Sequence, residues 1–431
     1  MSDPIVITAV VLFVAFFLMG IGVWIGYSLM MAGLIGFALF GPNINIATNV
    51  FFESTNSLTL TAIPLYIFLG EMLLACGASS SLFQGASRLF GWVPGGLLHA
   101  NVASCAVFAS ISGSSPATAA TIGTASIPEL SKRNYNKRLI YGSIAAGGTL
   151  GILIPPSINM IVFGMIANTS VGQLFLGGVG PGLLLTFLFM LYIGIRALLD
   201  PSVAPRESGV TIRSLLIGVA QLWPAYFLGF IVIGGILTGI VTPTEAAALG
   251  SFAAIILAAA MRQLTRKNIT SVLSNTVALS CMVLFIYVGA MVLASFFGAM
   301  NIPGLISELI NRLNVGPIAI LLIISLLYLV LGCFLDGISM MVLTVPTLMP
   351  IAMSAGLEPV WFGIFVIVLT EVGMITPPMG LNLFVVQGIS GDKLKEVALG
   401  ALPFFAIMMS SLYLIWLFPE IVLWLPSISK N

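Results

Sequence analysis

Long apolar runs alternate with short segments of glycine, proline or charged residues along the whole chain. The runs have the length of about 20 residues that a helix needs to cross the hydrocarbon core of a bilayer. No basic segment precedes the first run and no small-residue cleavage site follows it, so we interpret it as a retained span and not as a signal peptide. The pattern predicts ten membrane spans, at residues 5–20, 24–41, 58–77, 139–168, 181–199, 215–238, 246–262, 272–298, 359–389 and 403–424.

Two further apolar stretches are interrupted near their middle by small or polar residues. Residues 110–116 interrupt the stretch 95–131, and residues 332–337 interrupt the stretch 317–352. Each piece is only about 15–18 residues long, which is short for a span. The pattern predicts two re-entrant helical hairpins, whose polar tips must line a cavity enclosed by protein because lipid cannot satisfy their backbone groups. The alternative is a pair of tightly turned full spans at each place.

Composition supports a membrane protein. Of the 431 residues 59% are hydrophobic and 7% are charged, whereas soluble proteins carry about 25% charged residues. The mean hydropathy is +1.16. These values exclude a soluble or disordered chain, and the near balance of 15 Lys and Arg with 14 Asp and Glu indicates no polyanionic partner such as nucleic acid. The four cysteines lack C-x-x-C spacing, and we expect buried thiols. The prediction is an all-α polytopic membrane protein.

The chain matches itself at a shift of about 220 residues, a signature of internal repeats. Residues 22–33 align with residues 239–250 at a shift of 217. Five further pairs share a shift of 222, namely Pro128/Pro350, Gly151/Gly373, Pro155/Pro377, Pro156/Pro378 and Pro181/Pro403. We interpret the constant shift as two homologous halves, at residues 1–200 and 215–431, joined by a cytoplasmic linker at residues 201–214.

Charge predicts that the two halves run through the membrane in opposite directions. Residues 131–138 contain four basic side chains, whereas the matching residues 353–360 contain none. Residues 391–396 are charged, whereas their counterpart, residues 168–174, is not. By the positive-inside rule the two charged segments are cytoplasmic, and the other two segments and both chain termini are then periplasmic. Inverted repeats that each contain a hairpin and a broken helix are typical of secondary transporters.

A Pro-Pro pair breaks one predicted span in each half. Proline has no amide hydrogen, so Pro155 and Pro156 leave the carbonyls of Gly151 and Ile152 without their usual donors. Residues 373–378 repeat the arrangement in the second half. A simple kink is the alternative, but two Pro-Pro pairs at equivalent positions favour functional breaks. Free carbonyls at such breaks are suited to a small hard cation such as Na⁺.

The first hairpin tip carries the hydroxyl groups Ser112, Ser114 and Ser115 around Gly113. Free amides at the start of the second half-helix suit a carboxylate. The alternative for the serine hydroxyls is that they only bond to the backbone of their own helix, as is common in membrane helices. No Lys or Arg maps to the membrane interior. The ionisable residues in the predicted membrane elements are Glu71, Glu245, Asp336, Glu371 and His99.

Among these residues we expect Asp336 to organise the second hairpin tip, and Glu245 and His99 to lie at the membrane interface. The chain has neither the GxxxxGK[ST] loop of ATP-driven transporters nor the H-E-x-x-H motif of zinc proteases. We therefore expect a transporter and not an enzyme.

Five motifs together resemble the large membrane subunit, called DctM, of tripartite ATP-independent periplasmic (TRAP) transporters. They lie at residues 112–123, 155–157, 239–248, 336–337 and 376–382, and the resemblance covers nearly the whole chain. It implies an elevator-type permease in the bacterial inner membrane that imports an organic anion by Na⁺ symport. The anion would be a C4-dicarboxylate, a keto acid or a sugar acid such as sialic acid. The implied partners are a separate small four-helix membrane subunit and a periplasmic substrate-binding protein, and no organic cofactor is implied.

The resemblance also implies two Na⁺ sites and suggests residues for the substrate. The first ion site would comprise Ser112, Gly151, Ile154 and Pro156. The second would comprise Gly332, Gly373, Thr376 and Met379, with Asp336 at the same hairpin tip. The substrate candidates, chosen by proximity to the tips, are Ser114, Ser115, Asn159 and Asn382. Two other functions stay open, a stand-alone Na⁺/carboxylate symporter with the same inverted-repeat plan and a channel.

Overall fold

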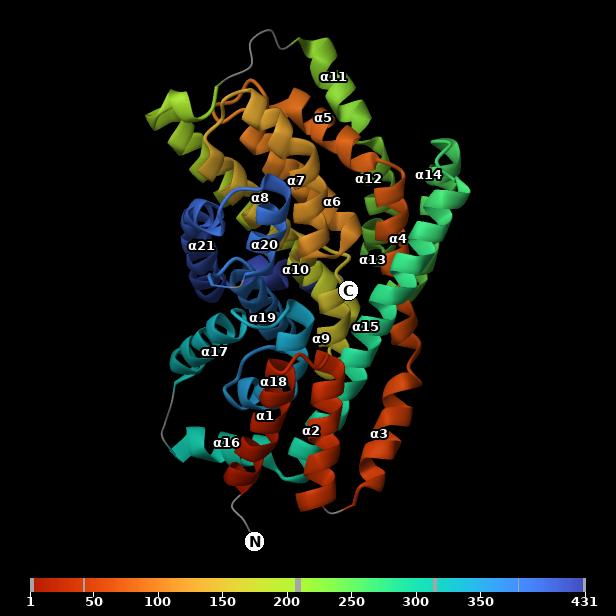
Figure 1. Ribbon diagram of the computed structural model, residues 1–431, viewed down its shortest axis with the longest axis vertical. Coiled ribbons are helices and arrows are strands. Elements are labelled where there is room, and N and C mark those ends of the chain that lie inside the picture. Colours follow the sequence, from red (N-terminus) through yellow and green to blue (C-terminus); the bar gives the residue numbers. More distant parts are fainter. Residues whose placement is uncertain (1–3, 42, 206–210, 313–315, 379, 429–431) are drawn as a thin grey trace.

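The computed structural model describes residues 4–41, 43–205, 211–312, 316–378 and 380–428, and the regular elements in these ranges are all helices (Figure 1). Up to residue 205 they are α1 (Pro4–Gly20), α2 (Ile25–Phe40), α3 (Asn45–Thr55), η1 (Leu58–Thr61), α4 (Ala62–Ala75), α5 (Ala78–Phe90), α6 (Leu97–Ser112), α7 (Ser115–Lys132), α8 (Lys137–Leu153), α9 (Ile158–Ile166), α10 (Val171–Leu199) and η2 (Pro201–Val203). From residue 211 they are α11 (Ile212–Gln221), α12 (Trp223–Gly229), η3 (Phe230–Gly234), α13 (Gly235–Leu237), α14 (Pro243–Ala260), α15 (Arg266–Ala299), α16 (Ile302–Arg312), α17 (Pro317–Leu331), α18 (Gly337–Ser354), α19 (Pro359–Met374), α20 (Leu381–Ser390), α21 (Leu394–Leu417) and α22 (Glu420–Ile428).

The helix lengths agree with a membrane protein. Within the described ranges six helices are long and apolar enough to cross a bilayer, and the number rises to eight if two bent pairs each count as one span. The bent pairs are α8 with α9, at 45°, and α11 with the helical segment 223–237, at 46°. Other predicted spans fall on apolar helices of 10–17 residues, such as α1, α2 and α19. The total of ten spans therefore stays a prediction.

Several predicted helix boundaries are wrong. Pro181 and Pro403 lie inside α10 and α21 and not at their starts. A proline inside a long helix removes one backbone hydrogen bond and bends the helix, but the helix continues on both sides. The last predicted span, 403–424, is also divided, because α21 ends at Leu417 and α22 begins after Pro419.

The two stretches predicted as hairpins each form two helices that break inside the predicted interruption. The first stretch forms α6 and α7, and the second forms α17 and α18. The stretch 139–168 forms α8 and α9, and the stretch 359–389 forms α19 and α20, so both Pro-Pro pairs lie between helices. The sequence did not predict the short helices α3, α5, α16 and α22 as separate elements. Figure 1 shows α5 near the upper end of the molecule and α16 lying across the lower end.

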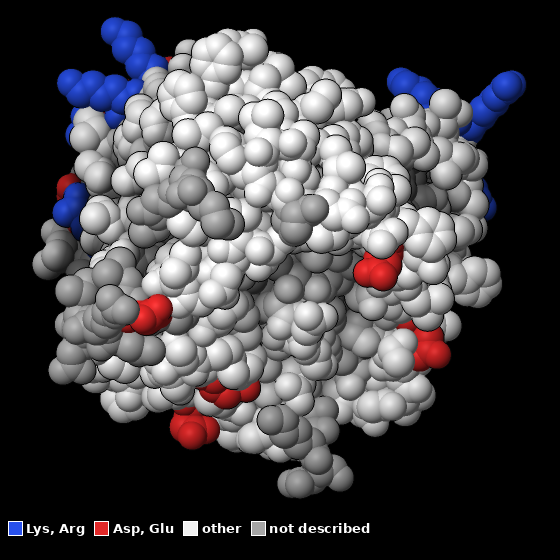
Figure 2. All heavy atoms as spheres, turned by 90° about the horizontal axis from the view of Figure 1, so that it is seen from below, with Lys and Arg blue, Asp and Glu red and all other residues white. Residues whose placement is uncertain are grey.

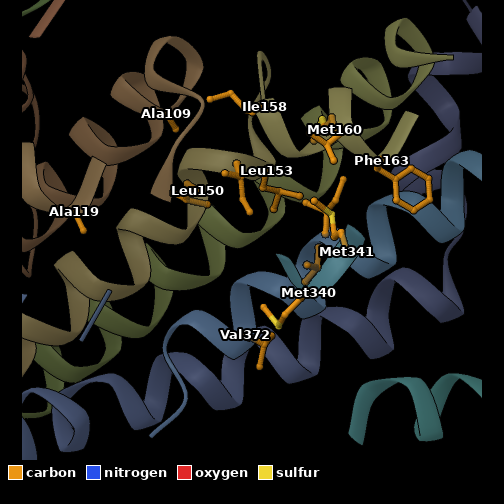
Figure 3. Close-up of a cluster of buried hydrophobic side chains, with 14 of the residues drawn as sticks. Ala109, Ala119, Leu150, Leu153, Ile158, Met160, Phe163, Met340, Met341 and Val372 are labelled. Carbon is orange, nitrogen blue, oxygen red and sulfur yellow. The ribbon is translucent and has the colours of Figure 1, made fainter. Parts of the chain in front are cut away.

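Helices α8 and α19 form the centre of the core. Every residue of α8 from Leu139 to Leu153 is buried, and so is every residue of α19 from Val360 to Met374. Helices α6, α7, α10 and α21 pack against α8, whereas α17 and α18 pack against α19. Figure 3 shows where the two halves meet, because its apolar cluster includes Leu153 of α8 as well as Met340 of α18. The two broken helices are therefore held inside protein and not against lipid.

Ion pairs join the two charged loops that the sequence assigned to the cytoplasm. The Lys137 Nζ lies 2.9 Å from Asp392 Oδ2, and the Arg138 Nε lies 2.8 Å from Glu396 Oε2. Hydrogen bonds from the Tyr141 hydroxyl and from Lys137 lower the pKa of the Asp392 carboxyl. The two loops therefore lie at the same end of the molecule.

The opposite end of the molecule carries acidic groups. Figure 2 shows this face from below; among the described residues that it colours, Asp and Glu carboxylates are scattered over the face, whereas Lys and Arg side chains lie at its rim. The distribution is the one that the positive-inside rule associates with a periplasmic face.

Candidate functional site

The first hairpin turns at two residues. Helix α6 ends at Ser112, Gly113 adopts a left-handed conformation (φ +59°), and Ser114 is extended (φ −139°). Glycine adopts a positive φ without steric cost. Pro116 lies in the first turn of α7, where its missing amide hydrogen removes no helical hydrogen bond. The tip therefore presents the C-terminal carbonyls of one helix next to the N-terminal amides of another.

This tip packs against the break between α8 and α9 through backbone atoms. A Cβ placed on Gly151 would lie 2.5 Å from the Ser114 carbonyl oxygen and 2.8 Å from Thr118 Oγ1. A Cβ placed on Gly113 would lie 3.0 Å from the Pro156 carbonyl oxygen. Real Cβ atoms hardly ever come this close to another atom, so glycine at both positions permits the contact. We call this arrangement of the first tip and the first break junction 1.

Oxygen atoms converge at junction 1. Thr118 Oγ1 donates to the Ser114 carbonyl at 2.8 Å and lies 2.8 Å from Ser112 Oγ. Of the predicted ligands of the first ion site, the structure thus brings Ser112, Gly151 and Pro156 to the same tip. Ile154 is the residue that follows α8, and its side chain packs against Gly182 of α10.

The second hairpin tip meets the second broken helix in a comparable way, which we call junction 2. Gly332 follows α17, and a Cβ placed on Gly373 of α19 would lie 3.0 Å from the Gly332 Cα. Cys333 Sγ lies 3.6 Å from the Pro377 carbonyl oxygen, so the tip also touches the Pro-Pro segment. Both junctions therefore pair a hairpin tip with a helix break of the same half.

The sequence predicts that the carbonyl of Gly373 has no hydrogen-bond donor, but in the structure it has one. The Thr376 amide donates to it at 3.1 Å, three residues later instead of four. The helix tightens at its end, a common way to satisfy terminal carbonyls, and the oxygen keeps a second lone pair. Thr376 Oγ1 donates to the Val372 carbonyl at 2.6 Å. The predicted ligand Met379 lies outside the described residues.

Asp336 caps the second half-helix of its hairpin. Its carboxylate accepts hydrogen bonds from the Ile338 amide, at 3.2 Å, and from the Ser339 hydroxyl. This accounts for an acidic residue at the tip, because a carboxylate stabilises the start of a helix. Asp336 therefore caps α18 at the second hairpin tip, and its predicted part in an ion site stays a prediction. The next residue, Gly337, touches the first half, because a Cβ there would lie 2.8 Å from Asn159 Nδ2.

The two asparagine candidates each contact the opposite half. Asn159, at the start of α9, lies against the second hairpin tip and is largely buried. Asn382, at the start of α20, is fully buried and donates from Nδ2 to the Ala145 carbonyl of α8 at 3.1 Å, while its Oδ1 has no partner among the described residues. Asn159 therefore lies at the contact between α9 and the second hairpin tip, and Asn382 anchors α20 to α8.

Two residues at these junctions make contacts that the sequence did not predict. Thr118 is buried at the tip, one turn into α7. In the sequence, the one indication of this position is that Thr118 follows Ser114 and Ser115 at helical spacing. Glu371 is fully buried on α19 and accepts a hydrogen bond from the Ser115 hydroxyl. The sequence places Glu371 in a membrane element, but it does not predict the contact with Ser115, because the two residues are 256 positions apart.

Two other candidates have structural partners. Glu245 Oε2 accepts from the Thr242 amide at 2.8 Å, and Thr242 Oγ1 accepts from the Glu245 amide at 3.3 Å, so the pair caps α14. The single histidine, His99, is buried with its Nε2 2.7 Å from the Pro94 carbonyl oxygen. Neither residue lies at a junction.

A cavity of about 450 Å³ opens at two loops that carry no Lys or Arg. It lies between the α9–α10 loop of the first half and the α18–α19 loop of the second half. Its lining residues are Ala167, Asn168, Thr169, Ser170, Gln173, Met349, Pro350, Met353, Glu358, Pro359 and Val360. The two loops that the sequence assigned to the periplasm thus share one opening, lined by both polar and apolar residues.

Comparison with protein families decides the identity. The family model described as "Tripartite ATP-independent periplasmic transporter, DctM component" matches residues 10–421. The chain belongs to this family. The resemblance seen in the sequence motifs is therefore confirmed, and the chain is a DctM-family permease, one component of a three-part transporter.

Relatives of this DctM-family permease match over nearly their whole length. The C4-dicarboxylate TRAP transporter large permease protein DctM of Vibrio cholerae is 34% identical over 95% of both chains. The sialic acid TRAP transporter large permease protein SiaM of the same organism is 31% identical, over 94% of this chain and 95% of the relative. Among solved structures the YdaH transporter of Alcanivorax borkumensis matches with a TM-score of 0.53 and 14% identity, over 87% of each chain, which shows a shared fold.

Proposed function

We propose that this DctM-family permease imports an organic acid by Na⁺ symport, together with a small four-helix membrane subunit and a periplasmic substrate-binding protein in the bacterial inner membrane. The observation that carries the proposal is the pair of junctions, at which a hairpin tip and a broken helix bring backbone and hydroxyl oxygens together inside the protein. Hard cations take oxygen ligands, and broken helices beside hairpins form the ion sites of secondary transporters.

The residues at the junctions fit Na⁺. At junction 1 the oxygens of Ser112, Ser114 and Thr118 lie within hydrogen-bonding distance of one another, next to Gly151. At junction 2 the available groups are the backbone of Gly332 and Gly373 and the hydroxyl of Thr376. A bound Na⁺ would supply the positive charge that allows an anion to enter the membrane interior. The protein residues would hold the ion and fix the two tips.

The substrate would be an organic acid. The two relatives named above are designated for C4-dicarboxylate and for sialic acid. This permease has no Lys or Arg in the buried core of its described part, so a substrate carboxylate would rest on the amides that start α7 and on side chains such as Asn159. One helix terminus contributes about 0.3–2 kcal/mol, so binding at the membrane site would be weak. Tight capture would fall to the periplasmic protein.

Movement of the substrate site would follow the elevator scheme. Helices α6 to α9 and α17 to α20 contain both tips and both breaks, whereas α2 and the 34-residue α15 pack tightly together outside them. We infer that the hairpins and broken helices move as one body against a frame that includes α2 and α15. The cavity between the α9–α10 and α18–α19 loops would then be the periplasmic entrance.

Reconstituted transport tests the proposal. Proteoliposomes that contain both membrane subunits are expected to accumulate a labelled C4-dicarboxylate or sugar acid only with an inward Na⁺ gradient and the cognate binding protein. ATP is expected to have no effect. Saturable uptake by this chain alone would instead favour a stand-alone symporter, and a flux that does not saturate would favour a channel.

A matched pair of variants links the Na⁺ dependence to junction 2. Thr376→Val keeps the shape of the side chain and removes one oxygen, so half-saturation of uptake is expected at higher Na⁺ concentration. Thr186→Val in α10 is the control, because Thr186 Oγ1 likewise donates to the carbonyl four residues earlier. An equal response of both variants would remove Thr376 from the ion site.

The proposed orientation is open to a labelling experiment. In a chain without Cys281 and Cys333, an impermeant maleimide added from outside is expected to label Ser354→Cys and to leave Ser131→Cys unmodified until the membrane is opened. Both serines are exposed, and the other two cysteines are buried. Labelling of position 131 from outside would reverse the orientation, and labelling of both positions from the same side would contradict the inverted halves.

A further inference from the structure

Glu371 is a buried acid that the proposed ion sites leave without a role. It lies on α19, two residues before Gly373 of junction 2, and its side chain is fully buried. One carboxyl oxygen, Oε1, accepts a hydrogen bond from the Ser115 hydroxyl, and the other, Oε2, has no hydrogen-bond partner among the described residues. A buried ionisable residue in a membrane protein is by default a functional candidate, and its partner indicates the function.

The partner, Ser115, belongs to junction 1. Ser115 is the first residue of α7 and follows Ser114, whose carbonyl accepts from Thr118 and packs against Gly151. A short chain of contacts therefore leads from the oxygens of junction 1 through Ser115 and Glu371 to α19. Gly373 lies two residues after Glu371 on α19 and contacts the Gly332 backbone.

Burial strengthens the hydrogen bond between Ser115 and Glu371. In the low dielectric of a protein interior a hydrogen bond is electrostatically stronger than in water, and breaking it leaves an unpaired polar group. The first turn of α7 and the last turn of α19 are therefore fixed relative to each other when the bond is intact. An ion that ordered the first tip would also order Ser115, and through Glu371 it would set the position of α19 at junction 2.

We propose that Glu371 is a positioning residue that makes the two ion junctions cooperative, through its hydrogen bond from Ser115. The inference rests on the proposed Na⁺ symport. Coupling between two sites in proteins amounts to about 5- to 150-fold in affinity. Loss of the link therefore lowers the Hill coefficient for Na⁺ from near two toward one and raises the Na⁺ concentration at half-saturation.

The unpartnered Oε2 defines a conservative control. Only one oxygen of Glu371 takes part in the link, so Glu371→Gln keeps an acceptor for Ser115 and removes the carboxylate. Glu371→Met keeps the length of the side chain and removes the acceptor. Ser115→Ala removes the donor from the other side with the loss of a single atom. The link then predicts that Gln resembles the wild type, whereas Met and Ala resemble each other.

The test measures Na⁺ binding and transport in the full complex. Protection of the purified complex against heat, titrated with Na⁺, gives a Hill coefficient without transport, and uptake in proteoliposomes gives the maximal rate and the half-saturating Na⁺ concentration. We expect Glu371→Met and Ser115→Ala to bind Na⁺ with a Hill coefficient near one and the double variant to be no worse than either. Glu371→Gln is expected to stay near the wild-type value.

Two results would overturn the proposal. Undiminished cooperativity in Ser115→Ala would show that the hydrogen bond does not couple the junctions. Loss of cooperativity in Glu371→Gln would show that the carboxylate itself is needed and would favour direct ligation of a cation. A wild-type complex that is indifferent to Na⁺ would instead refute the proposed symport, so the two failures are distinguishable.

Discussion

Gly332→Ala is expected to abolish Na⁺-driven uptake while the complex still assembles. Gly332 has ordinary helical dihedral angles (φ −62°, ψ −17°), so alanine fits the local backbone. The added Cβ, however, would overlap the Gly373 Cα, and neither backbone can rotate away as a side chain can. The second hairpin tip must therefore move away from α19 by the order of 1 Å, and a misplacement of about 1 Å at a functional site can cost about 100-fold in rate. Initial rates of uptake at saturating Na⁺ measure the loss.

Gly388→Ala is the matched control for this substitution. Gly388 is also a helical glycine of the second half, in α20, but a Cβ there meets nothing within 4 Å. Alanine is more favourable than glycine in a helix by about 1 kcal/mol, so this variant is expected to transport at least as well as the wild type. Normal uptake by Gly332→Ala would show that the close contact at junction 2 is not required for transport.

Gly142→Ala is expected to destabilise the folded permease more than it alters transport by the molecules that fold. Gly142 of α8 faces Gly400 of α21, and a Cβ on Gly142 would overlap the Gly400 carbonyl. A Cβ on Gly400 would in turn overlap the Arg138 carbonyl, so the two helices touch through their backbones over a full turn. Small residues allow this close approach between membrane helices. Forcing extra volume into such packing typically costs about 1–3 kcal/mol.

The expected result is a melting temperature several degrees below that of the wild-type complex in the same detergent, with a lower yield of folded protein. Gly298→Ala in α15 is a suitable control, because a Cβ there meets no atom within 4 Å. An unchanged melting temperature for Gly142→Ala would mean that α8 and α21 separate without loss, and the tight joint between them would then have no structural importance.

The sequence predicted the breaks of the fold better than its helix ends. Pro-Pro pairs and clusters of glycine and serine act locally on the backbone, so their positions translate directly into the gaps between α8 and α9 and between α6 and α7. Pro181 and Pro403 misled the prediction, because the surrounding turns of a long helix compensate for one missing hydrogen bond. Whether a proline ends a helix depends on how other helices pack around it, and the sequence pattern does not give this packing.

Some residues of the candidate site were predictable from the sequence and others were not. Ser112, Gly151, Gly332 and Gly373 were predictable because each lies in a local motif, and the structure places each of them at a junction. The partner of Glu371 was not predictable, because the bond to Ser115 depends on how the two halves pack. The capping role of Asp336 follows from its position before α18 and could have been recognised from the start of that helix.

The junctions consist largely of main-chain atoms, and this separates two properties of the transporter. Every residue has the same main chain, so under the proposed symport the backbone part of each ion site would tolerate most substitutions that keep the glycines and the hydroxyls of Ser112, Thr118 and Thr376. The groups that would contact the cargo, such as Asn159, are side chains and can be exchanged one at a time. Under the proposed symport a new cargo preference would therefore arise, in evolution or by engineering, without any change in the energy source that drives the import.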